Sequence, residues 1–254
     1  MKNVDCADIK DLYPYYDLLK RRGFLIELTD KGLSLSDNSH KNDWKYLDEI
    51  LKEQKIGSCQ SLDQIVINGT ADFKALTSLF SSRKQGSVGV GANNRDHSWR
   101  RLRNRNHADK IPVSWLEPYI AYYIKALSAC GIYTGGCCDG NHPKVTKMYI
   151  EFDGPVYREL HKCLWENQLS QKFNISWDKT FSKIDLRNDR HKQYEELFRA
   201  ADYIYNHRIY YQNVRQRAAV WITRSVEKNS SHEELKNRFL EQLTKVLTEL
   251  QAIQ

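Results

Sequence analysis

The order of helical and strand patterns after residue 110 constrains the fold of this chain more than any other feature. The run "SWLEPYIAYYIKALSACG" places apolar residues at helical spacing, and "KMYIEFD" alternates apolar and polar residues as a half-buried strand does. A helix is predicted from Pro155 to about Gln168, and "KFNISWD" and "FSKIDL" then form a hairpin. With "IYTGGC" as the first strand and a long helix after the hairpin, the order is α-β-β-α-β-β-α. This order is typical of an α+β domain with a four-stranded, mainly antiparallel sheet that carries helices.

Composition and spacing divide the chain into four parts. Residues 1–82 predict a small α/β unit, in which helices flank two short strands within "FLIELTDKGLSLS". Residues 83–110 have no apolar period and several glycines, so we expect a basic, mobile loop there. Residues 111–187 form the central α+β domain, and residues 188–254 form C-terminal helices. The last helix carries an apolar stripe that we expect to dock onto a partner or onto a second copy in a homo-oligomer: Leu235, Phe239, Leu243, Val246 and Leu250.

The composition of the 254 residues excludes several classes of protein. The hydrophobic content of 41% is typical of a chain that folds. No apolar run approaches the ~18 residues of a membrane helix, and the first residues include acids where a signal peptide requires apolar side chains. The six cysteines are scattered without the spacing of a disulfide framework. We therefore expect a cytoplasmic protein with reduced thiols, no membrane partner and no cofactor.

Positive charge is concentrated in residues 83–110. This segment holds eight Lys or Arg residues and two Asp residues, so it carries +6 of the formal net charge of +7. Guanidinium groups bind phosphates bidentately, and an indole ring stacks on nucleic-acid bases. The segment therefore predicts a nucleic-acid interface, with a solvated loop or a contact with an acidic protein surface as alternatives. The predicted nucleic-acid-binding residues are Arg95, Trp99, Arg100, Arg101, Arg103 and Arg105.

The sequence "CGIYTGGCCDGNH" joins two adjacent cysteines to a turn and a histidine. In the structural interpretation, Asp139 and Gly140 form a tight turn with a positive φ at Gly140, and Cys138 faces the core. In one alternative, Cys137, Cys138 and His142 are ligands of a zinc ion, with His161 or Cys163 as the fourth ligand, although adjacent thiolates rarely bind one tetrahedral ion. In another alternative, a cysteine thiolate is a nucleophile that His142 or Lys144 activates. We favour the structural interpretation.

Two family resemblances rest on the same segment. The helix, "GIYTGGCCDG" and the strand "MYIEF" are together similar to a pattern in uncharacterised proteins of phages and prophages, from which the chain departs at Cys137 and Asn141. This resemblance implies a phage or mobile-element context, with the host cytoplasm as location, but no activity. The element order, with "CDG" in the place of "ADG", also resembles one unit of a LAGLIDADG homing endonuclease. That resemblance implies that Asp139 is a catalytic, metal-binding carboxylate of a homodimeric nuclease.

These patterns lead to one functional hypothesis and one alternative. We expect a cytoplasmic binding protein that engages nucleic acid, or a host defence complex that handles nucleic acid, through its basic loop. An anti-defence role follows from the phage resemblance alone. The alternative is a metal-dependent nuclease with Asp139 as its carboxylate. Because no pair of acidic residues has the spacing of a metal site or an acid–base couple, the sequence favours a binding protein over an enzyme.

Overall fold

The computed structural model places this chain in the α+β class, as the sequence predicted, with a helical C-terminal region. The described backbone comprises residues 9–30, 32–56, 58–60, 64–67, 73–80, 108, 110–141, 147–152, 157–158, 160–162, 175–177, 181–185 and 189–225, with short helical pieces between 234 and 248. Among the described helices, none combines the length and the apolar character that a membrane span requires. Several predicted features lie outside the described residues: Arg95, Trp99, Arg100, Arg101, Arg103, Arg105, His142 and the apolar stripe of the last helix.

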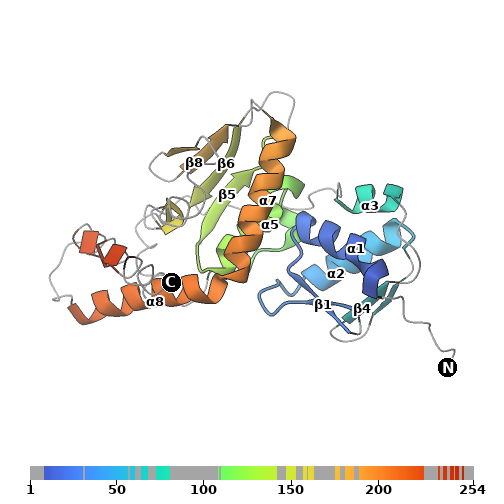
Figure 1. Cartoon of the computed structure of the whole chain (residues 1–254), viewed down its shortest axis with the longest axis horizontal. Helices are drawn as coiled ribbons and strands as arrows, with labels where there is room; N and C mark the ends of the chain where they lie inside the picture. Colours follow the sequence, from blue (N-terminus) through green and yellow to red (C-terminus); the bar gives the residue numbers. More distant parts are fainter. Residues whose placement is uncertain are drawn as a thin grey trace. The chain divides into compact units, whose positions relative to one another are not determined.

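The first of two compact units contains the described residues up to Phe80 together with residues 110–125. Its elements are α1 (Ile9–Arg22), β1 (Ile26–Thr29), β2 (Gly32–Leu35), α2 (Asp43–Glu53), β3 (Ser58–Gln60), β4 (Gln64–Ile67), α3 (Phe73–Phe80) and the 3₁₀ helix η2 (Val113–Trp115) (Figure 1). The sheet is antiparallel in the order β1-β2-β4-β3, and Ile26 pairs with Leu35. The sequence predicted β1 and β2 but neither β3 nor β4.

The core of this unit joins α1 and α2 to the sheet through buried apolar side chains such as Leu19, Leu47 and Ile65. Gly23 ends α1 in the left-handed region, with φ +107°, and its N–H donates to the carbonyl oxygen of Lys20 at 2.9 Å. A Cβ atom at Gly23 would lie 2.6 Å from the Cβ atom of Ala121. Glycine is therefore required here both for the backbone angle and for the close approach of the chain to residue 121.

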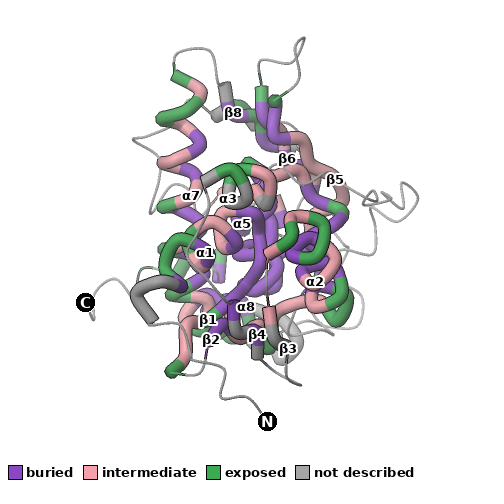
Figure 2. Tube along the Cα trace, turned by 90° about the vertical axis from the view of Figure 1, so that its right-hand side faces the viewer, coloured by how far each residue is buried: buried purple, intermediate pink, exposed green. Residues whose placement is uncertain are grey.

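Helix α5 (Pro118–Ala129) is buried along almost its whole length. Every residue from Ile120 to Ala129 is buried, and Figure 2 shows the helix in the colour of buried residues. Lys125 is its one charged residue, so this ammonium group requires a partner in the protein interior. The partner, Asp43, belongs to the first unit. The pairing is one contact that joins residues 110–125 to that unit. The sequence had instead suggested one domain over residues 111–187.

The second unit contains the remaining four residues of α5 and the described residues that follow them. Its elements are β5 (Thr134–Cys138), β6 (Lys147–Phe152), β7 (Ile175–Trp177), β8 (Phe181–Asp185), α7 (Arg190–Asn206) and α8 (Arg208–Ser225). The sheet is antiparallel in the order β5-β6-β8-β7, and Figure 1 shows β5, β6 and β8 side by side. In β6, Met148, Ile150 and Phe152 are buried, as their alternation predicted.

An arginine of α8 is buried in the second unit beside the entry to β5. The side chain of Arg215 is 2% exposed, and burial lowers its pKa while the nearby hydroxyl of Tyr157 opposes the shift. Gly131 has φ +83°, and a Cβ atom there would lie 3.2 Å from the Cδ atom of Arg215. The rings of Tyr133 and Tyr157 pack with their centroids 5.1 Å apart. The chain therefore turns from α5 into β5 directly over the Arg215 side chain.

Candidate functional site

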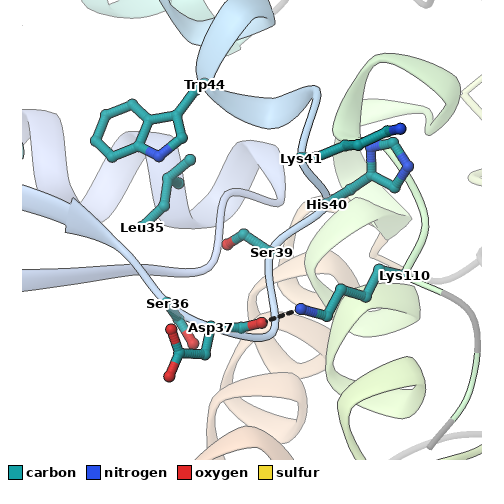
Figure 3. Close-up of a pocket in the computed structure, with 8 residues that line it drawn as sticks. All are labelled: Leu35, Ser36, Asp37, Ser39, His40, Lys41, Trp44 and Lys110. Atoms are coloured by element: carbon teal, nitrogen blue, oxygen red, sulfur yellow. Dashed lines mark hydrogen bonds between the residues drawn. The ribbon is translucent and has the colours of Figure 1, made fainter. Parts of the chain in front are cut away.

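A pocket of about 540 Å³ opens in the first unit, between the β2–α2 loop and the segment that precedes η2. Pockets of roughly 300–1,000 Å³ are typical of small-ligand sites. Lys110 is the last residue of the basic segment 83–110, so one residue of that segment lines the pocket. The residues that line the pocket are Leu35, Ser36, Asp37, Ser39, His40, Lys41, Trp44 and Lys110 (Figure 3).

The two ends of the pocket differ in chemistry. Trp44 and Leu35 lie together at one end, whereas His40, Lys41 and Lys110 gather at the other (Figure 3). Trp44 and Leu35 are half-buried against the core of the unit, so part of the indole ring stays accessible, and both lysines are exposed. An aromatic ring at one end and ammonium groups at the other suit a ligand that has a flat apolar part and a negative charge.

A buried ion pair fixes the walls of this pocket. Lys125 Nζ lies 2.7 Å from Asp43 Oδ2, and both side chains are 1% exposed. Lys125 Nζ also donates to the carbonyl oxygen of Ile111 at 2.7 Å, and burial lowers the pKa of Lys125 while the Asp43 charge opposes the shift. Asp43 accepts two further hydrogen bonds, from the N–H of Val113 at 2.9 Å and from that of His40 at 3.0 Å. One carboxylate therefore joins the β2–α2 loop to residues 111–113.

A second buried cation strengthens the same junction. Arg22, at the end of α1, is fully buried; it donates to the hydroxyl of Tyr46 at 3.0 Å and to the carbonyl oxygen of Val113 at 3.4 Å. The β2–α2 loop is also held from within, because the hydroxyl of Ser39 donates to the carbonyl oxygen of Leu25 at 3.0 Å. The pocket is therefore preformed by side chains that are hydrogen-bonded to the scaffold.

His40 presents one nitrogen as a fixed donor. Its Nδ1 accepts a hydrogen bond from the N–H of Asn42 at 3.1 Å, so the proton of the neutral ring is on Nε2. Burial lowers the pKa of His40, the charges of Lys125, Lys41 and Lys110 lower it further, and Asp43 opposes them. The ring is therefore neutral at pH 7 and offers a single Nε2–H donor.

Lys110 spans the pocket mouth to the β2–α2 loop. Its ammonium group donates to the backbone carbonyl of Asp37, whereas the carboxylate of Asp37 lies on the side away from Lys110 (Figure 3). An ammonium group has three N–H donors, so this bond leaves two of them for a ligand. Together with Lys41, the cationic end therefore provides two positive charges next to the neutral donor of His40.

The adjacent cysteines lie in a strand, and this placement separates them. Cys137 pairs with Ile150 and Cys138 pairs with Tyr149 in the β5–β6 ladder. Successive side chains of a strand point to opposite faces, so these two thiols do not converge on one metal ion. Cys138 is half-buried, not in the core as predicted, and its Sγ accepts a hydrogen bond from the N–H of Gly140 at 3.4 Å.

Asp139 and Gly140 form the predicted turn. Gly140 has φ +71°, which confirms the expected positive angle. Asp139 is buried; its Oδ1 accepts from the N–H of Asn141 at 2.8 Å, and its carbonyl oxygen accepts from the hydroxyl of Tyr194 at 2.8 Å. The residues before it form strand β5, whereas the LAGLIDADG resemblance requires a helix there. The structure therefore gives Asp139 a role in the turn and does not favour the nuclease alternative.

We expect Asp139→Ala to lower the free energy of unfolding by about 1–2 kcal/mol, because the buried turn loses the acceptor of the Asn141 N–H. Asp139→Asn keeps a side-chain oxygen at the same place, so it should cost less than about 1 kcal/mol. Urea unfolding at pH 7 measures both changes. Equal losses in the two variants would contradict the role of this acceptor in the turn.

No protein-family model, curated protein or solved structure matches the chain. Apart from Lys110, which ends the basic segment, the residues that line the pocket were not predicted as site residues from the sequence. The sequence contains one signal of the pocket, the polar run "SDNSHKNDW" between a strand and a helix. This run contacts Lys110, which is more than seventy positions away, so the sequence pattern alone does not reveal the contact.

Proposed function

We propose that this protein binds nucleic acid through the basic segment 83–110 and the pocket at its end. The observation that carries the proposal is the position of Lys110, which belongs to a segment with a charge of +6 and also lines a pocket with Lys41, His40 and Trp44. Clustered cations bind the phosphate backbone, and an accessible indole ring beside them is typical of proteins that also contact bases.

The biological setting is part of the proposal. An acidic protein surface, or a host defence complex that handles nucleic acid, is the alternative target of the same positive charge. A phage or mobile-element origin and an anti-defence role in the host cytoplasm rest on the family resemblance of residues 116–152. Experiment separates these alternatives. Salt weakens the binding of nucleic acid to a phosphate-binding surface in a characteristic way, and a protein that competes for that surface does not show the same salt dependence.

We expect the wild-type protein to bind nucleic acid with a strong dependence on salt. Neutralisation of about five or six phosphates gives a log–log slope of roughly −4 to −5 on duplex DNA, and a shallower slope on single strands. Replacement of Arg100, Arg101, Arg103 and Arg105 with alanine should flatten the slope by roughly three units. Fluorescence anisotropy of a labelled oligonucleotide over a salt series measures both slopes.

A matched control removes four exposed cations elsewhere: Lys45, Lys52, Lys192 and Arg199. This control variant has the same net charge as the arginine variant. A loss of nucleic-acid affinity that depends on net charge alone would therefore be equal in the two variants. We expect the control to keep most of the wild-type slope. No salt-sensitive binding of the wild-type protein to DNA or RNA at low ionic strength would refute the proposed function.

A further inference from the structure

We infer that the pocket lined by Trp44, His40, Lys41 and Lys110 holds one nucleotide of a single-stranded nucleic acid. The base stacks on Trp44, and the adjoining phosphate lies at the cationic end. This inference rests on the proposed function and makes it more specific, because it assigns one subsite and one class of nucleic acid.

The cationic end has the donors that a phosphodiester requires. Lys41 and Lys110 supply two positive charges, and His40 supplies an Nε2–H that its bond to Asn42 keeps in place. A phosphodiester carries one negative charge and two unesterified oxygens, which accept such charge-assisted hydrogen bonds. The carboxylate of Asp37 points away from Lys110, so it does not occupy the place of the phosphate (Figure 3).

The aromatic end has the properties of a stacking platform. Trp44 is anchored, because it belongs to α2 and packs against the apolar core on one side. Leu35 lies beside the indole ring and extends the apolar surface (Figure 3). A base that stacks here replaces water over an aromatic face. Stacking tolerates any base, because every base has a π face.

The position of Lys110 favours a strand over a free nucleotide. In the sequence, this residue ends a segment with a formal charge of +6, and a strand, unlike a free nucleotide, has further phosphates that such a segment binds. A duplex does not fit the aromatic end, because its bases are stacked on each other and are not accessible to Trp44. The ligand that uses both ends of the pocket is therefore an unpaired strand.

The pocket is preorganised for such a ligand. The carboxylate of Asp43 binds the N–H groups of His40 and Val113, and Lys125 binds Asp43 and Ile111. The loop with His40 and Lys41 and the segment with Lys110 are thus tied to one buried ion pair. Binding does not require the loop to be ordered first, which reduces the entropic cost of association.

The test compares anisotropy of labelled oligo(dT), oligo(rU) and a DNA duplex with the full-length protein. Trp44→Leu keeps an apolar side chain on the core and removes the aromatic face, and we expect it to weaken single-strand binding by about 5- to 150-fold. Trp44→Phe keeps an aromatic face and should restore most of the affinity. Duplex binding should change little in both variants, and thermal melting confirms that each variant is folded.

The cationic end is tested with Lys41→Gln combined with Lys110→Gln. We expect the single-strand salt slope to flatten by about 0.7, which corresponds to one phosphate. The matched control combines Lys45→Gln and Lys52→Gln, two exposed lysines of α2 that do not line the pocket, and should leave the slope unchanged. Thymidine monophosphate and inorganic phosphate serve as competitors and should displace the oligonucleotide only at far higher concentrations.

Two results together would refute the inference and leave the proposed function intact. Trp44→Leu would bind single strands as tightly as the wild-type protein, and the arginine variant of segment 83–110 would still lose affinity. The inference also fails if Trp44→Leu weakens duplex and single-strand binding equally, or if thymidine monophosphate competes as well as the oligonucleotide does. Absence of wild-type binding to any of the three probes would refute the proposed function itself.

Discussion

Replacing Lys125 with methionine is expected to lower the free energy of unfolding by about 3–5 kcal/mol. The substitution leaves the carboxylate of Asp43 at 1% exposure without the ammonium group 2.7 Å from it. It also removes the hydrogen bond to the carbonyl oxygen of Ile111. The cost of an uncompensated buried charge exceeds the small gain from the apolar methionine. Urea unfolding of the two proteins at pH 7 gives the difference.

A double variant separates the ion pair from the packing of α5. Asp43→Asn with Lys125→Met removes both charges and keeps an oxygen for the Val113 N–H, so it should be more stable than Lys125→Met alone. The control is Lys45→Met, because Lys45 is 82% exposed and its Nζ lies 3.8 Å from Glu49. This control should change stability by less than about 0.5 kcal/mol. A Lys125→Met protein as stable as the Lys45→Met protein would contradict the importance of the pair.

The class of the fold was predictable because its main signals are local. The alternation of Met148, Ile150 and Phe152 marked β6, and the glycine after Asp139 marked the turn. Strands β3 and β4 have only three and four residues, too few to establish a period of two. The equally short β1 and β2 were recognised by the glycine turn between them, whereas residues 61–63 between β3 and β4 contain no glycine. They complete a sheet with β1 and β2 through pairings that the sequence pattern does not reveal.

The pocket was not predictable, because its parts are brought together by contacts between distant positions. Asp43 and Lys125 are 82 positions apart, and Asp43 and Val113 are 70 apart. One signal was available: Lys125 stands alone in an otherwise uncharged, apolar helix, and such a residue requires a buried partner. The identity of the partner was not available, because the other acidic residues of the chain were equally plausible from their spacing. The conspicuous cysteine pair proved to be part of an ordinary strand and turn.

Acidification is expected to destabilise the second unit through one buried histidine. His161 is fully buried, and its ring packs on Phe152 with the centroids 4.9 Å apart. Burial lowers the pKa of His161 to about 3, whereas the unfolded chain has a histidine pKa of about 6.5. Between these values the unfolded state binds a proton that the folded state excludes, so stability falls as the pH falls. The loss from this residue is about 2 kcal/mol between pH 7 and pH 5, and about 4 kcal/mol by pH 3.

His161→Phe isolates this contribution, because phenylalanine occupies a similar place beside Phe152 and does not titrate. Carboxylates also titrate in this range, but they do so in both proteins. The quantity to compare is therefore the difference in unfolding free energy between pH 7 and pH 5, measured by urea unfolding of each protein. We expect this difference to be about 2 kcal/mol smaller in the variant, whatever the stability of the variant at pH 7. Equal pH dependence of the unfolding free energy in the two proteins would mean that His161 takes up a proton in the folded state as it does in the unfolded chain. The interior of the second unit would then stabilise an imidazolium ion.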